Sequence, residues 1–246
     1  MKKLSLTGLA VGAALAVLVP GANAAIGIVG SAHDFYNNTN TWINGITKPV
    51  SGNSTNVCSE CHTIHHAANP ANGPLWAHKA SSQTYITYAS AGSETFDALG
   101  LTVALGTSSK ACLSCHDGTV GINEKTSLVM DGSGTATSSI AGGTAVVLDD
   151  AVIAVNGNDL THTHPIGVSY DSAQAALPAG ELKDKTGTFP NTTGSPTIAQ
   201  MLKGANKTQM ECSTCHDIHR TRGNAPNSGI YTVASGQNLC MGCHNK

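Results

Sequence analysis

The chain has 246 residues, of which only 11% are charged and 4% are aromatic, and its formal net charge at pH 7 is −2. This charge excludes the strongly basic surface that binds nucleic acid or an anionic membrane. The length would suffice for one or two ordinary domains, but so few large side chains provide little material for an ordinary hydrophobic core.

The first 24 residues have the organisation of a secretory signal peptide. Lys2-Lys3 forms a charged n-region, Leu4–Val19 an apolar h-region, and Ala22-Asn23-Ala24 a small-x-small cleavage pattern. An apolar run of this length without a stop-transfer flank is not a membrane span. We expect cleavage before Ala25, leaving residues 25–246 as one domain that is secreted to the extracellular space or cell surface, with the periplasm as the alternative.

Every cysteine belongs to one of four copies of a single pattern, in which two cysteines lie three residues apart and a histidine follows directly. The cysteines are Cys58, Cys61, Cys112, Cys115, Cys212, Cys215, Cys240 and Cys243, and the histidines are His62, His116, His216 and His244. This pattern is the attachment signature of a c-type haem. Two thiols on one helical turn add to the vinyl groups of the porphyrin, and the adjacent imidazole binds the iron. The sequence therefore predicts four covalently attached c-type haems.

Other roles for the cysteine pairs do not explain the histidines. Eight cysteines in an exported chain could form four disulfides, two pairs could hold a zinc ion, and one pair could be a redox-active dithiol. None of these roles requires histidine at the next position. Histidine fills 11 of the 246 positions, so four such followers by chance are very improbable.

In chain order, residues 25–57 indicate an extended polar segment with a short strand at 26–29. Two β-branched runs, Ala145–Leu148 and Ala151–Val155, predict a hairpin within a β-rich insert at about 126–160. Pro and Gly punctuate residues 172–208 as loop, with a short helix near Thr197–Lys203. The expected fold is mostly irregular, with short helices, a few short strands and the row of haems as its core, because each haem presents a large apolar face.

Seven histidines remain after the four proximal ones: His33, His65, His66, His78, His162, His164 and His219. Four irons need four distal ligands, so bis-histidine ligation throughout is the economical interpretation. Methionine is the alternative ligand and would raise the reduction potential, with Met130, Met201 and Met210 available. None of these methionines repeats a pattern.

Local sequence favours some distal candidates. His65 and His219 each lie three residues after a proximal histidine. If the attachment motif begins a short helix, each lies one turn further on, where it can reach only the iron of a neighbouring haem. Pro165 holds His164 in an extended segment, which suits a ligand delivered from a loop. Trp76 is expected to pack on a porphyrin.

The order of these motifs resembles that of exported multihaem cytochromes, and more narrowly the OmcE-type tetrahaem extracellular cytochrome filament (nanowire) family. The resemblance covers most of the mature chain except 121–160 and 172–208. It rests on the strings Ser31–Phe35, Cys61–His65, Pro74-Leu75-Trp76, Cys112–Val120, His164-Pro165-Ile166, Cys212–His219 and Leu239–His244.

The resemblance implies bis-histidine haems packed as a continuous chain, in subunits that polymerise and supply a distal histidine to a neighbour. Matched by position, the distal ligands would be His33, His65, His164 and His219, with His33 crossing to the next subunit. The alternative for His33 is an intramolecular ligand or a plain surface histidine. Because His66 follows His65 directly, the choice between these two histidines as the distal ligand stays open. We take His78 as the reserve ligand and His162 as solvent-facing.

Bis-histidine irons have no open position for a substrate, so we expect an electron carrier and not an enzyme. Its function would be outer-sphere electron transfer along four haems, in an extracellular filament for extracellular respiration. Its partners would be copies of itself, other periplasmic or outer-membrane cytochromes, and extracellular electron acceptors. The low charge favours self-association. The alternatives are a soluble monomeric periplasmic tetrahaem shuttle and a multihaem reductase with one open haem.

Overall fold

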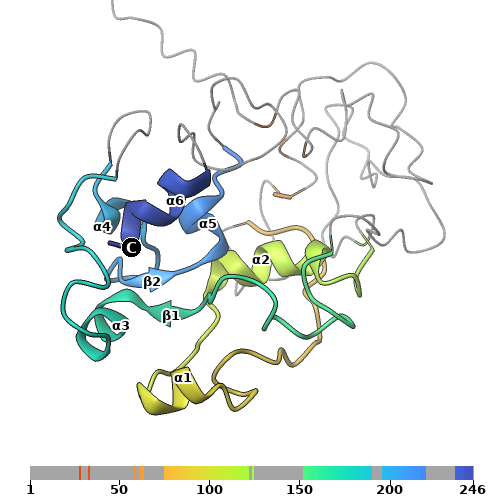
Figure 1. The fold of residues 1–246 in the computed structure, drawn as a ribbon. Helices are drawn as coiled ribbons and strands as arrows, with labels where there is room; N and C mark the ends of the chain where they lie inside the picture. Colours follow the sequence, from red (N-terminus) through yellow and green to blue (C-terminus); the bar gives the residue numbers. More distant parts are fainter. Residues whose placement is uncertain are drawn as a thin grey trace, which may run out of the picture.

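The computed structural model of the chain describes residues 28, 33, 58, 61–63, 75–121, 124, 152–189, 196–219 and 236–245. Its elements are short and are joined by long irregular segments (Figure 1). They are α1 (Glu94–Ala98), α2 (Thr107–His116), β1 (Val168–Ser169), α3 (Tyr170–Ala176), α4 (Ile198–Met201), β2 (Gln209–Met210), α5 (Cys212–Cys215) and α6 (Gly236–Cys243). The predicted fold class, mostly irregular with short helices and a few short strands, is confirmed.

A two-stranded antiparallel ribbon joins segments that are distant in sequence. Val168 of β1 pairs with Met210 of β2, and Val103 forms an isolated bridge with Val168. Gly167, at φ +76, allows the close approach of the chain before α2, because a Cβ there would lie 2.9 Å from the backbone carbon of Ala104. The ribbon therefore holds the start of α2, the chain after His164 and the start of α5 together.

The short helices begin at polar caps. The Ser169 hydroxyl accepts a hydrogen bond from the backbone N–H of Ser172 at the start of α3. Thr197 and Gln200 form a capping box at the start of α4. This helix confirms the prediction of a short helix near Thr197–Lys203.

The described hydrophobic core consists of two small clusters, and each includes a residue of an attachment motif. The first surrounds the end of α6 and contains Tyr170, Leu182, Phe189, Ile198, Met201, Leu202 and Cys243. The second lies against α2 and contains Leu113, Ala154 and Leu160. Helices α2 and α5 pack against each other beside the ribbon (Figure 1). The apolar side chains thus support the segments that carry the cysteines.

Two strand predictions fall largely outside the described residues. Of the strand at 26–29, only Ile28 is described, and it lies in a turn. Of the insert at 126–160, residues 152–160 are described, and they form isolated bridges, including one between Val155 and Asp159. Neither prediction is tested further.

The packing of α6 explains why the fourth motif contains a glycine, Gly242. A Cβ at Gly242 would overlap the buried ring of Phe189. We expect Gly242→Ala to destabilise the fold by about 1–3 kcal/mol, as overpacking does, measured by thermal unfolding. Phe189→Leu should restore stability in the double variant, because it vacates that space. A double variant as unstable as Gly242→Ala would contradict the steric explanation.

Candidate haem-binding site

Each attachment motif forms one helical turn. The backbone N–H of the histidine donates to the carbonyl of the first cysteine, at 2.9 Å for His62, 3.0 Å for His216 and 2.9 Å for His244. The second motif forms the end of α2. This turn places two thiols on the same side and the imidazole next to them, as haem attachment requires. All eight cysteines are free of disulfides, and the motifs indicate covalently bound c-type haem.

Helices α2 and α6 end at their motifs, and α5 consists of the third motif alone, so no helix continues beyond these three motifs as the prediction for His219 required. Helix α5 ends at Cys215, and His216 is extended, with φ −109 and ψ 121. Helix α2 ends at His116, and the carboxylate of Asp117 then accepts the backbone N–H of Thr119 at 2.8 Å and turns the chain. His219 therefore does not lie one helical turn beyond His216, because the extended His216 ends the helix and a turn at residues 218–219 follows.

Three proximal histidines face a histidine from a distant part of the chain. The ring centres are 6.0 Å apart for His33 and His116, 6.2 Å for His62 and His219, and 6.4 Å for His164 and His244. An imidazole nitrogen binds a transition metal at about 2.0 Å. The same nitrogen lies about 1.1 Å from the centre of its own five-membered ring, given ring bonds of about 1.3–1.4 Å. Two imidazoles on opposite sides of one iron would thus have centres about 6.2 Å apart. The observed spacings fit a bis-histidine haem.

Burial favours the neutral form of His33, and a contact with a backbone carbonyl orients the ring of His164. Burial lowers the pKa of His33 to about 4, with further contributions from the rings of His116, His216 and His219. Nδ1 of His164 lies 3.0 Å from the carbonyl oxygen of Pro165. An imidazole that donates from Nδ1 keeps the Nε2 lone pair for a metal.

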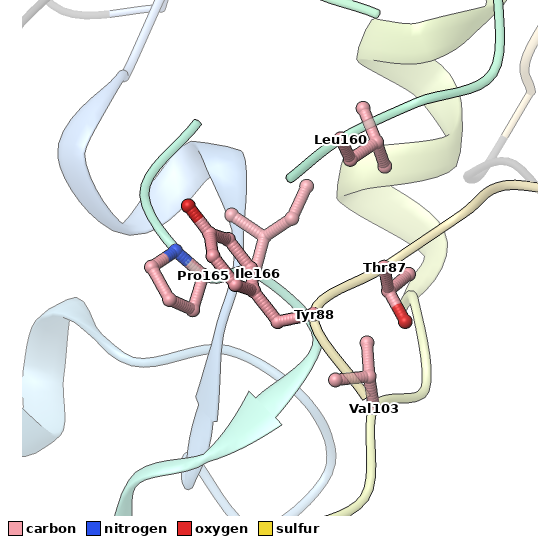
Figure 2. A pocket seen from close by; sticks show the side chains of 6 residues that line it. All are labelled: Thr87, Tyr88, Val103, Leu160, Pro165 and Ile166. Atoms are coloured by element: carbon pink, nitrogen blue, oxygen red, sulfur yellow. The ribbon is translucent and has the colours of Figure 1, made fainter. Parts of the chain in front are cut away.

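The loop that presents His164 is anchored by a small apolar pocket. Figure 2 shows the side chains that line it, among them Tyr88, Pro165 and Ile166. The Tyr88 hydroxyl also donates to the carbonyl oxygen of Thr163 at 2.8 Å. These contacts fix the chain on both sides of His164, so they hold this histidine in place.

The other histidines have different surroundings. His78 is buried, with Nε2 3.0 Å from the carbonyl oxygen of Gly121 and 3.4 Å from Sγ of Cys115. The reserve candidate thus lies against the attachment site of the second motif. His162 is exposed, and its Nε2 is 3.7 Å from a carboxylate oxygen of Asp159. His65 and His66 lie outside the described residues.

The potential methionine ligands have no described role at the histidine pairs. Met201 packs in the first apolar cluster, and Met210 is buried in the ribbon. Met130 lies outside the described residues. Met201 and Met210 therefore contribute to packing.

Trp76 provides an independent indication that a group binds beside His62. Its ring meets the ring of His62 edge-on, with centres 5.8 Å apart, and the two residues form a β-bridge. Among the described residues, Nε1 of Trp76 is the buried side-chain polar atom without a hydrogen-bond partner. Such atoms are rare and point to a missing partner. A haem carboxylate is an acceptor of the required kind, so the site fits this cofactor.

The attachment sites are neighbours in space. Cys112 and Cys212 form a thiol–thiol hydrogen bond, and this contact together with burial raises the pKa of Cys112. Helices α2 and α5 pack against each other. Cys215 is close enough to Cys240 for each charged form to disfavour the other, which contributes to a raised pKa of Cys215 after the larger effect of burial. The second, third and fourth motifs thus form a continuous series.

The doubled CXXCH motif family matches residues 204–246, which contain the third and fourth attachment motifs. The comparison with curated proteins gave no match. The doubled motif indicates a haem-binding cytochrome c that transfers electrons. In the described part of the chain, no helix is long and apolar enough to cross a membrane.

The ring pair of His164 and His244 predicts a specific loss of ligation. In the His164→Ala variant, the iron held by His244 should lose its distal ligand and bind carbon monoxide, which needs an open axial position. The carbon monoxide difference spectrum should report one reactive haem per chain. The matched control is His162→Ala, which changes an exposed histidine two residues away and should leave every haem unreactive. Equal reactivity in both variants would contradict the pairing.

Proposed function

We propose that the protein is a tetrahaem c-type cytochrome in which every iron has two histidine ligands, and that it conducts electrons by outer-sphere transfer. The observation that carries this proposal is the set of three imidazole pairs with ring centres 6.0, 6.2 and 6.4 Å apart. When bound, the haems supply one-electron reduction and oxidation at iron. The protein holds each iron between two side chains and brings neighbouring attachment sites into contact.

The fourth pair follows from the first three. They use His62, His116 and His244, so His216 remains among the proximal histidines and His65 among the distal ligands predicted by matching position. His219 follows the third motif, and its ring lies near His62 of the first motif. If His65, which follows the first motif, ligates the iron of the third haem, each of the two segments supplies a distal ligand to the haem of the other. Two haems that exchange ligands in this way must lie close together, which favours fast electron transfer between them.

Bis-histidine ligation also decides against catalysis. An iron with both axial positions filled cannot bind nitrite, sulfite or a similar substrate without first losing a ligand. A reductase would need one open haem, and the seven histidines beyond the proximal four exceed the number needed to fill four distal positions. We therefore propose a carrier and not an enzyme.

We further propose that the chain is exported through the signal at residues 1–24 and assembles into an extracellular filament. The near-neutral charge supports this assembly, because little electrostatic repulsion opposes stacking of subunits. The resemblance of the motif order to the tetrahaem filament cytochromes supports it as well. The partners would be further copies of the chain, other exported cytochromes, and extracellular electron acceptors. A soluble periplasmic shuttle with the same four haems is the alternative.

We propose that His33 ligates an iron of its own chain and does not bridge to the next subunit. His33 lies opposite His116 of its own chain, which favours the intramolecular alternative. A filament would then depend on contacts between subunit surfaces or on another histidine.

The first experiment concerns the number and ligation of the haems. The purified mature protein should contain four haems per chain by pyridine haemochrome assay, and none should bind carbon monoxide. His65→Ala should create one reactive haem, whereas the adjacent control His66→Ala should not. Fewer than four haems, or a wild-type haem that binds carbon monoxide, would contradict the proposed function. Reactivity in His66→Ala alone would transfer the distal role to His66.

The second experiment concerns assembly. Negative-stain electron microscopy of the extracellular fraction should show filaments of the wild-type protein. His33→Ala should open one haem to carbon monoxide while filaments persist, because His33 ligates within its own chain. Loss of filaments in this variant would restore the cross-subunit role of His33. If the wild-type protein carries four haems but forms only single particles, the filament proposal is rejected and the soluble shuttle remains.

A further inference from the structure

Glu211 is a buried carboxylate directly before the third attachment motif. It is 2% exposed, in a chain with very few charged side chains. Its Oε1 accepts the backbone N–H of Gly106 at 2.9 Å, and its Oε2 accepts the hydroxyl of Ser109. Both donors belong to the start of α2, which carries the second motif. Glu211 thus connects the second attachment helix to the third.

The same network reaches the attachment cysteines. The Ser109 oxygen accepts the backbone N–H of Cys212 at 3.1 Å, so Ser109 bridges the carboxylate and the third motif. Cys112 and Cys212 are hydrogen-bonded to each other. Glu211 is therefore close to the junction at which the second and third haems would be attached.

The hydrogen-bond pattern is that of an ionised carboxylate. Both oxygens accept, and neither donates. Gly106 is the N-cap of the ten-residue helix α2, and the first N–H groups of a helix carry partial positive charge that stabilises an anion. Bonds of this charge-assisted kind hold the carboxylate in one position. A negative charge is therefore fixed where little water screens it.

We propose that Glu211 sets the reduction potentials of the second and third haems through its charge and positions their two attachment helices. This inference rests on the proposed function, because it assigns haems to Cys112, Cys115, Cys212 and Cys215. Reduction of a ferric haem adds one electron near a fixed negative charge. Glu211 opposes this addition and lowers both potentials relative to a site without the charge.

The test compares Glu211→Gln with Glu94→Gln by spectroelectrochemical titration of the loaded protein. Glutamine keeps the shape and the acceptor for Gly106 but removes the charge. We expect the reduction equilibrium of two of the four haems to shift about tenfold toward the ferrous form, which is about 59 mV for a one-electron couple. Glu94 is exposed on α1 and controls for the loss of one surface charge. No shift beyond that of the control, or an equal shift in all four haems, would overturn the inference.

A second variant separates charge from positioning. Ser109→Ala removes one hydrogen bond of the carboxylate but keeps its charge, so the two potentials should not rise. If Ser109→Ala raised the two reduction potentials as much as Glu211→Gln does, only the contact between the helices would matter. That result would contradict the inference. If Glu211→Gln does not load haem, Ser109→Asp/Glu211→Gln returns a carboxylate from α2 and should restore loading. Failure of that variant as well would overturn the charge role. A wild type with four unreactive haems keeps the proposed function in each of these cases.

Discussion

The pairing of imidazole rings from distant segments is the constraint that the rest of this structure depends on. His62 meets His219, His116 meets His33, and His244 meets His164. In the proposed bis-histidine ligation, an iron would accept its two axial ligands only from opposite sides and at one distance, so the chain would have to return to each attachment site from elsewhere. Long irregular segments make these returns possible, which explains why regular secondary structure is scarce.

The short regular elements hold the segments that carry these rings. The ribbon of β1 and β2 fixes the loop after His164 against the chain that leads into α2 and α5. The pocket beside Tyr88 secures the same loop from the other side. The larger apolar cluster packs around Cys243 at the end of α6. Stability is therefore concentrated at the attachment turns, where a small displacement would spoil ligation.

Adjacency of the attachment turns connects the structure to electron transfer. The hydrogen bond between Cys112 and Cys212 and the packing of α2 against α5 make neighbours of sites that are separate in sequence. Glu211 and Ser109 fix this junction with hydrogen bonds to both sides. Helix contacts thus bring the second and third attachment turns together, and the buried carboxylate of Glu211 lies at this junction, where we propose that it lowers the reduction potentials.

The sequence by itself determined the attachment sites, because covalent haem chemistry requires two cysteines and a histidine within five consecutive residues. It also predicted a mostly irregular fold, since so few aromatic and charged side chains cannot build long amphipathic elements. The resemblance to the tetrahaem filament cytochromes implied a distal set by matching position, and three of its members, His33, His164 and His219, lie near proximal rings. Only the tertiary structure decided which rings meet, that helices end at the motifs, and that His78, Trp76 and Glu211 lie at the attachment sites. These features depend on contacts between residues far apart in the chain, and local sequence patterns do not specify such contacts.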